Sequence, residues 1–185
     1  LGLSDAGEQG QIKPDLQVAS AVKPDSPLIG LARFTGATCS VTMPTGGLIS
    51  GQSAIVQYDG WNFDDLVFVP QLALEMSLPS KKIAEEGRSR RRFGPSSRQA
   101  DEENADKPQP ELSPYDTVLE LFASTREYDR IKTEAAKRQV RGPDFDNQLE
   151  SLIPYARKEK PVVIRVRSAT DILDAIEFAK ELDVK

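Results

Sequence analysis

The sequence contains no histidine and a single cysteine, Cys39. Histidine is the usual general base near neutral pH, the partner of serine or cysteine in nucleophilic pairs, and a frequent zinc ligand. Its absence therefore excludes those pairs and most zinc sites from this chain. A lone cysteine excludes an internal disulfide and leaves the redox compartment undefined. We expect no catalytic residue and no metal-binding set within these 185 residues.

Long apolar runs and a basic surface are missing as well. No run approaches the ~20 apolar residues that span a bilayer, so we expect no membrane span. The formal net charge of -5 argues against a nucleic-acid partner, which would favour a basic surface. The chain opens at Leu1 without a targeting pattern. We therefore expect it to begin inside a longer protein, whose location, exported or cytoplasmic, stays unknown.

Helices are predicted by capping residues followed by apolar positions at helical spacing. Ser26-Pro27 and Ser113-Pro114 each place a capping hydroxyl before a proline at the first helical position, and Ser168 begins a capping box. The apolar face of each helix is expected to be buried. The predicted helices cover 27–35, 114–139, 146–158 and the segment that follows Ser168.

Strands are predicted where apolar residues alternate or β-branched residues gather. These segments are 37–43, 55–58, 161–166 and, more weakly, 67–74. Strands that alternate with helices indicate βα repeats around a parallel sheet. Because a complete (β/α)8 barrel needs ~250 residues, we predict an α/β fold that is a partial (β/α)8 TIM-barrel fragment with an irregular insertion.

Composition divides the chain into three parts. Residues 1–78 are expected to form an N-terminal βα portion of the barrel, and 114–185 a helical segment with a further βα unit. Residues 79–113 carry four prolines, mixed charge and few apolar side chains. Such a stretch buries too little surface to offset chain entropy, so a mobile insertion or linker is predicted.

A glycine-rich segment, 46–53, follows the first predicted strand. Its spacing differs from GxSxG, and no base is present to activate the serine. A backbone nest for an anion is one interpretation. A tight turn with close packing is the other, and it is favoured because glycine clusters are common in turns. Ser50 and Gln52 are nevertheless candidate ligand-binding residues.

Two arginines complete the candidate site. Arg165 and Arg167 have the same parity on the last predicted strand, so both side chains lie on one face. An arginine inside a barrel, near the C-terminal ends of its strands, would bind an anion. Alternatively, the strand is frayed and both guanidinium groups reach solvent. The two-residue period does not decide between these interpretations.

The segment from Thr35 to Ala54, with Pro44-Thr45-Gly46-Gly47 and Ile49-Ser50-Gly51-Gln52-Ser53, closes on Asp59-Gly60-Trp61. It resembles amidohydrolase-superfamily proteins of the imidazolonepropionase-like kind, most of all the often exported bacterial members with a large insertion after this strand. Residues 1–3 resemble the family's residues just after the metal-binding histidine pair of its first strand, and 161–180 are similar to a later barrel strand and its helix. The resemblance fails across 79–113.

This resemblance implies a metal-dependent barrel that hydrolyses non-peptide carbon–nitrogen bonds of a small-molecule substrate through metal-activated water. The family's divalent metal, of the zinc type, would be held by histidines outside these residues. Relatives carry a His-x-His pair where this sequence has Arg165 and Arg167, and arginine cannot ligate a metal. Two alternatives remain open: a non-catalytic barrel that binds an anionic ligand or serves in assembly, or an unrelated α/β binding domain. Unclosed βα units would also favour self-association.

Overall fold

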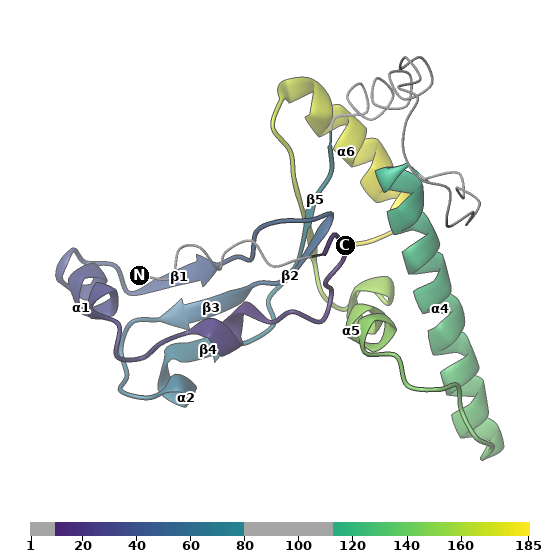
Figure 1. The fold of residues 1–185 in the computed structure, drawn as a ribbon, viewed down its shortest axis with the longest axis horizontal. Helices are drawn as coiled ribbons and strands as arrows, with labels where there is room; N and C mark the ends of the chain where they lie inside the picture. Colours follow the sequence, from purple (N-terminus) through teal and green to yellow (C-terminus); the bar gives the residue numbers. More distant parts are fainter. Residues whose placement is uncertain (1–9, 80–112) are drawn as a thin grey trace, which may run out of the picture.

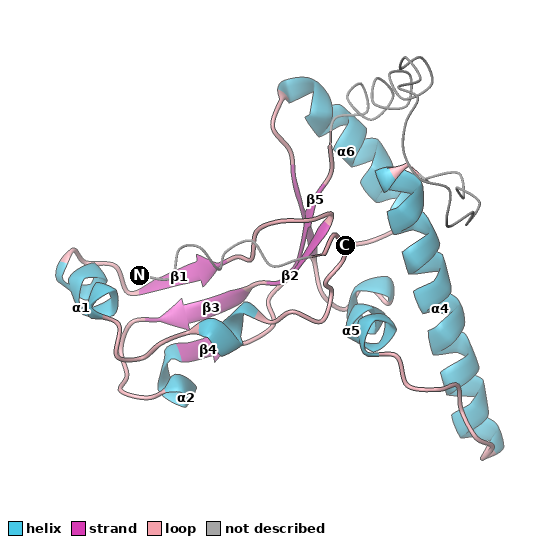
Figure 2. Ribbon diagram, in the orientation of Figure 1, coloured by secondary structure: helices cyan, strands magenta, loops and turns pink. Residues whose placement is uncertain are grey.

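The computed structural model describes residues 10–79 and 113–185. These residues form a mixed α/β fold with two three-stranded sheets (Figures 1 and 2). The elements in chain order are η2 (Val18–Ala21), α1 (Pro27–Phe34), β1 (Cys39–Thr42), β2 (Ile49–Gln52), β3 (Ala54–Gln57), α2 (Phe63–Leu66), β4 (Val67–Val69), β5 (Leu74–Ser77), α4 (Pro114–Arg138), α5 (Asn147–Ala156), β6 (Val162–Arg165) and α6 (Ala169–Leu182).

The first sheet, in the order β1-β3-β4, is antiparallel throughout. It forms the lobe at the left of Figure 1, together with α1 and α2. The alternating pattern of 37–43 correctly predicted β1. In α2 the Asn62 side chain accepts a hydrogen bond from the Asp65 backbone N–H, and the Asp65 carboxylate accepts one from the Asn62 N–H. This capping box explains why a helix of one turn forms directly before β4.

The second sheet has the order β2-β5-β6 and lies at the centre of the molecule (Figure 1). β2 runs antiparallel to β5, whereas β5 and β6 are parallel and are connected through α4 and α5. Residues 12–17 extend this sheet by isolated parallel bridges from Ile12 to Ile49 and from Gln17 to Gln52. The parallel pair follows from the helical crossover, because a short turn can join only antiparallel strands.

The core lies between the second sheet and the helix layer of α4, α5 and α6. Tyr115 and Phe178 meet edge to face there, with ring centroids 5.1 Å apart. One face of the β5–β6 pair supplies Leu74, Met76, Val162 and Ile164 to this core. The fully buried helix residues of the cluster are Val118, Phe122, Leu152, Tyr155 and Leu182. The sheet therefore has an apolar face toward the helices and a second face that points away from them.

The predicted helices are confirmed within one or two residues at most ends. α4 is capped at its C-terminus by Gln139, whose left-handed φ of 54° stops the helix. α5 is capped at its N-terminus by Asp146, whose carboxylate accepts hydrogen bonds from the N–H groups of Gln148 and Leu149. α6 is capped by Ser168, whose hydroxyl accepts a hydrogen bond from the Asp171 N–H. Local capping chemistry was thus sufficient to place these boundaries.

The expected βα repeats around one parallel sheet are wrong for the N-terminal part. β1, β3 and β4 pair antiparallel, and β2 and β5 do as well. The described residues form two small sheets and do not form a barrel. The reason is that β2 and β3 follow β1 directly, without a crossover helix between them. The expected insertion at 79–113 falls, except for its two end residues, outside the described part of the chain.

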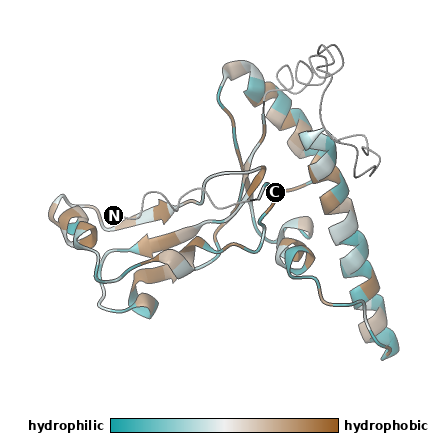
Figure 3. Cartoon of the chain, viewed as in Figure 1, coloured by the Kyte–Doolittle hydropathy of each residue, from teal (hydrophilic) through white to brown (hydrophobic). Residues whose placement is uncertain are grey.

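Several apolar helix positions are exposed, contrary to expectation. α1 buries no residue, and Phe34 is 88% exposed. In Figure 3 much of α1 carries the brown colour of apolar residues. On α4 Ile131 is exposed, and α6 exposes Leu173 and Ile176 while it buries Phe178. Helical spacing of apolar residues predicted the helices correctly. It does not predict whether another element among the described residues covers their apolar faces.

Close packing explains the glycine-rich segment. Gly47 has φ +74°, and a Cβ there would lie 2.6 Å from the Gln11 carbonyl oxygen. Gly51 has φ +127°, and its Cβ would lie 2.6 Å from the Leu16 carbonyl oxygen. Both glycines therefore let residues 10–16 approach β2, which confirms the interpretation of a tight turn with close packing. Part of the segment, Ile49–Gln52, is a buried strand rather than a loop.

Among the described residues, no helix combines the length and apolar character needed to cross a bilayer.

Candidate functional site

The face of β5 and β6 that points away from the helices carries polar side chains. Glu75 pairs with Val163 and Ser77 with Arg165 in the parallel register. Because side chains alternate along a strand, Glu75, Ser77 and Arg165 lie opposite the core residues Leu74 and Ile164. The structure thus decides the parity that the sequence left open: Arg165 belongs to the polar face of this sheet and not to the helix layer.

Glu75 is a buried ionisable residue on the polar face of β5 and β6. The residue is 1% exposed, and neither carboxylate oxygen has a hydrogen-bond partner among the described residues. Burial raises the pKa of Glu75, and the nearby Ser53 hydroxyl and the positive charge of Arg165 offset part of this rise. The Ser53 hydroxyl donates its hydrogen bond to the Ala73 carbonyl oxygen at 3.2 Å, so it does not satisfy the carboxylate. Sequence reasoning missed Glu75, because a single glutamate in a weak strand pattern gives no signal of burial.

The two predicted arginines are both exposed. The Arg165 Nη2 lies 4.0 Å from the sulfur of Met43, the first residue after β1. Arg167 follows the end of β6, directly before the Ser168 cap of α6. Within the described part of the chain, neither guanidinium group forms an ion pair. Arg165 can therefore meet an anionic group on the polar face, whereas Arg167 lies at its edge.

Ser50 lines a small pocket on the N-terminal side of the second sheet. The pocket has a volume of about 260 Å³, and it is lined by Ser50, by Met43–Thr45 and by six residues of the N-terminal segment, Lys13, Leu16, Gln17, Val18, Ser20 and Ala21. Met43 therefore lines the same pocket as Ser50 and also lies beside Arg165.

Gln52 makes a structural contact instead. Its side-chain Nε2 donates to the Pro14 carbonyl oxygen at 2.9 Å, and its backbone N–H donates to the Leu16 carbonyl oxygen at 2.7 Å. Both bonds attach the N-terminal segment to the edge of β2. The Gln52 Oε1 is buried without a partner among the described residues. Ligand binding by Gln52 and Arg167 stays a prediction, and the contacts of Gln52 favour a role in packing.

The described residues do not fit the divalent metal that the family resemblance implies. They include no group of three or more histidine, cysteine, aspartate or glutamate side chains that could hold a metal ion. Glu75 is a single carboxylate, and Arg165 and Arg167 keep their protons and cannot ligate. A metal needs three or four such donors at one point. A metal of the kind that the resemblance implies would have to be held by residues other than the described ones.

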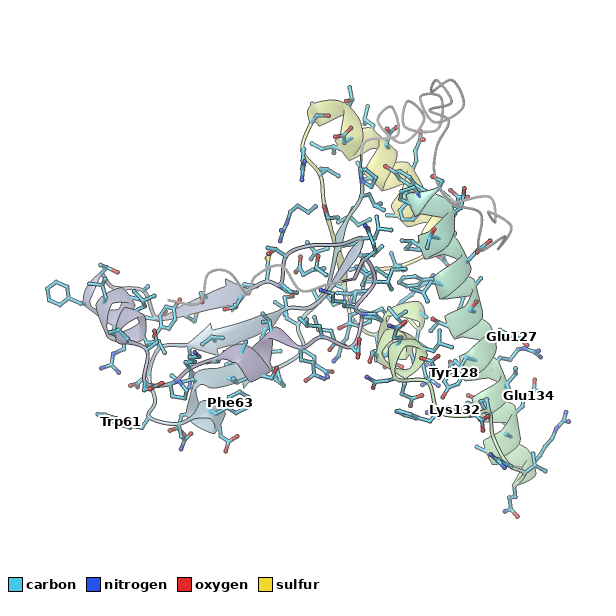
Figure 4. All side chains as sticks on the ribbon, in the orientation of Figure 1. Trp61, Phe63, Glu127, Tyr128, Lys132 and Glu134 are labelled. Atoms are coloured by element: carbon cyan, nitrogen blue, oxygen red, sulfur yellow. The ribbon has the colours of Figure 1, made fainter. Side chains whose placement is uncertain are left out.

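A further groove, which the sequence did not predict, lies between α4 and α5. It has a volume of about 660 Å³. Four of its charged side chains are paired across the two helices: Arg157 donates to both Asp129 oxygens, at 2.7 and 2.8 Å, and Lys132 pairs with Glu150. Lys137 and Glu159 also line the groove. Figure 4 shows Lys132 on α4 at the side of the helix that faces this groove. These pairs hold the helices together, and the groove offers no unpaired charge among these four to a ligand.

The order of strands and helices is that of part of an amidohydrolase chain. The structure matches an amidohydrolase from Thermotoga maritima with a TM-score of 0.73 and 18% sequence identity. The match covers 96% of this chain and 43% of that chain, so the chain spans less than half the length of its structural relative. No family model and no curated protein matches the sequence. The predicted resemblance is therefore confirmed at the level of the fold, over a partial length.

Proposed function

We propose that this chain is part of a longer amidohydrolase-like protein that hydrolyses non-peptide carbon–nitrogen bonds of small molecules. The observation that carries the proposal is the structural match, which extends over nearly the whole chain but less than half of the amidohydrolase. A β5–α4–α5–β6–α6 order with parallel strands is the unit from which (β/α)8 barrels are built. In this proposal, further βα units complete the barrel and cover the polar face of the second sheet.

The contribution of this chain to such an enzyme is substrate binding. Activation of the attacking water belongs to residues outside the described part, since the described residues bring no base and no set of metal donors together. Arg165 is exposed on the polar face, with its guanidinium group beside Met43. A guanidinium group in this position would bind an anionic group of the substrate through paired hydrogen bonds and so orient the scissile bond.

The test is a comparison of matched substrates with the full-length gene product. N-acetylated amino acids and their carboxamide analogues differ only in one anionic group. We expect hydrolysis of the carboxylates, with a KM that rises about tenfold or more in Arg165→Ala and is unchanged in Arg141→Ala, an exposed control arginine. Failure to hydrolyse any member of a panel of amides, ureas and cyclic imides, with divalent metal supplied, would contradict the proposal.

A second candidate function is a non-catalytic relative that binds an anionic ligand or serves in assembly. It is favoured by one observation: arginines occupy the places where the resemblance puts a histidine pair. The two candidates differ in turnover and in metal content. A full-length protein that binds carboxylates through Arg165, contains no stoichiometric metal and shows no turnover supports the second candidate. Normal metal content with turnover excludes it.

A further inference from the structure

An exposed tryptophan lines a hollow on the lobe that the first sheet forms with α1 and α2. The hollow has a volume of about 610 Å³, and its walls come from α1, from the residues just before it and from the loop that joins β3 to α2. Trp61, in that loop, is the one tryptophan of the chain and is 94% exposed. Figure 4 shows it on this lobe, away from α4. Its indole ring offers a flat apolar surface to a ligand.

The loop that carries Trp61 is attached to both neighbouring helices. The Trp61 N–H donates to the Asp65 carboxylate of α2 at 3.2 Å. From α1, the Arg33 Nη1 donates to the Tyr58 carbonyl oxygen at 3.3 Å and lies 3.6 Å from the Asp59 carboxylate. The fold therefore holds the backbone of the tryptophan beside the hollow, and preorganisation of this kind lowers the entropic cost of binding.

The hollow also presents polar groups that other residues do not use. The Asp25 carboxylate has no partner among the described residues. Ser26 directly precedes α1, but its hydroxyl group makes no cap hydrogen bond. Arg33 contacts the loop through Nη1, and its Nε and Nη2 have no partner in the described part of the chain. The wall thus combines a carboxylate, a hydroxyl group and part of a guanidinium group, all open to a ligand.

This combination selects a neutral ligand with several hydroxyl groups. A carboxylate only accepts hydrogen bonds and a guanidinium group only donates them, whereas a hydroxyl group does both. An anion would be repelled by Asp25, and a cation by Arg33. The apolar walls, which include Pro27, Ile29 and Trp61, require a ligand that also has an apolar face. A pyranose ring satisfies these conditions, because C–H groups gather on its face and hydroxyl groups surround its edge.

We propose that this hollow binds a neutral carbohydrate of about the size of a disaccharide. The volume of about 610 Å³ lies within the range of ~300–1,000 Å³ that is typical of small-molecule sites. One sugar ring stacks on Trp61, and its hydroxyl groups exchange hydrogen bonds with Asp25, Ser26 and Arg33. These residues belong to the lobe of the first sheet, whereas Arg165 lies on the second sheet. The proposal is therefore independent of the proposed hydrolase function, and either can fail without the other.

The test is a titration of the protein with two neutral glucose disaccharides, cellobiose and maltose, followed by calorimetry and by the fluorescence of Trp61. Sorbitol is the control ligand, because it carries hydroxyl groups but has no ring face. We expect at least one disaccharide to bind and to shift the Trp61 emission to shorter wavelength, and sorbitol to do neither.

Substitutions then locate the site by calorimetry. Trp61→Ala should weaken binding of the disaccharide about tenfold or more, because the stacking surface is lost. Asp25→Ala should weaken it several-fold, since an acceptor for the sugar hydroxyl groups is removed. Phe68→Ala is the matched control and should leave binding unchanged, because Phe68 is an exposed aromatic residue on β4, outside the hollow.

Three results would overturn the proposal: neither disaccharide binds, sorbitol binds as tightly as the disaccharides, or disaccharide binding is unchanged in Trp61→Ala. A hexaproline peptide is a further probe, because proline-rich segments dock on exposed aromatic rings. If this peptide binds with a dependence on Trp61 and the disaccharides do not, the hollow is a peptide site and the carbohydrate proposal is wrong. Melting curves and far-ultraviolet circular dichroism of each variant establish that binding is lost from a folded protein.

Discussion

Glu75 offers the sharpest test of the energetics of this fold. The residue lies on β5, the central strand of the second sheet, between Gly51 on β2 and Val163 on β6. Its carboxylate is buried, without a hydrogen-bond partner in the described part of the chain. The perturbation is Glu75→Gln, which keeps the shape of the side chain and removes its negative charge.

The stability that Glu75→Gln is expected to add depends on pH, and the direction of this dependence follows from the raised pKa of Glu75. Burial raises the pKa of Glu75 in the folded protein above its ordinary value of 4.5. The folded state therefore binds a proton more tightly than the unfolded chain does. Stability consequently falls as the pH rises from about 4.5 through the raised folded pKa of Glu75. Above that window the folded protein carries an ionised, unsatisfied carboxylate in its interior.

The magnitude follows from the cost of that group. A buried polar group without a partner costs about 1–3 kcal/mol, and a charged one costs more. The attraction of Arg165 offsets little of this cost, because that guanidinium group is exposed and screened by solvent. We therefore expect Glu75→Gln to stabilise the protein by about 1–3 kcal/mol at pH 8, and by much less near pH 4.

The assay is urea unfolding at pH 4.5, 6 and 8, followed by circular dichroism. In thermal unfolding, a gain of 1 kcal/mol in the free energy of unfolding should raise the melting temperature by about 2–4 °C in a chain of this size. Glu120→Gln is the matched control, since Glu120 is exposed on α4, and it should leave stability within about 0.5 kcal/mol. If Glu75→Gln is destabilising at every pH, or if its gain does not grow with pH, then Glu75 has a partner and the reasoning is wrong.

Three further outcomes are expected for stability, and one for association. Phe122→Ala should cost about 3–5 kcal/mol in urea unfolding, because Phe122 is fully buried in the core. Tyr115→Phe should cost about 1 kcal/mol, since its hydroxyl donates to the Pro79 carbonyl oxygen at 2.8 Å. Tyr155→Phe should be neutral or slightly stabilising, because the Tyr155 hydroxyl, whose pKa burial raises to about 12, has no partner among the described residues. In sedimentation velocity the protein should self-associate as its concentration rises, and Leu173→Lys, on the exposed apolar face of α6, should shift it toward the monomer.

Local chemistry in the sequence correctly predicted the helices and three of the strand positions, those of β1, β3 and β6. Proline after a capping serine specifies the start of α1 and α4, and Ser168 specifies the start of α6. Each signal acts within one turn, so it does not depend on the rest of the fold. The same holds for the capping box of α2. The caps of α2 and α6 are short-range hydrogen bonds, whereas Ser26 and Ser113 form no side-chain cap bond, and α1 and α4 start at the prolines in their first positions.

The pairing of the strands was not predictable by the same means. The order of elements indicated βα repeats, yet β1 pairs with β3 across the intervening β2, which belongs to the other sheet. β2 contains Gly51 in its interior and has a register shift between Ile49 and Gly51. Glycine weakens the interior of a strand, so the local sequence did not predict a strand here. Its glycine is explained only by the approach of the Leu16 backbone, which is a long-range contact.

For the candidate site, too, local features were predictable from the sequence and long-range contacts were not. The parity of Arg165 and Arg167 was readable from the period of a strand, but the identity of the polar face required the core residues Val162 and Ile164. Ser50 was chosen for a loop that proved to be a strand, and it nevertheless lines a pocket. Lys13 and Glu75 were not predicted, because the surroundings of each are formed by residues distant in sequence.

The polar face of the second sheet connects the fold to the proposed function. Parallel strands are normally covered on both faces, and the helices cover only the face that carries Leu74 and Ile164. On the other face Glu75 is buried, while Arg165, two residues beyond the Val163 that pairs with Glu75, is exposed. A sheet that buries an unsatisfied carboxylate and exposes a guanidinium group beside it gains stability when a further layer or a ligand satisfies both. In the proposed function the same face could take part both in barrel closure and in anion binding. The pH dependence of the stability change caused by Glu75→Gln in the full-length protein would then show whether the Glu75 carboxylate has gained a partner there.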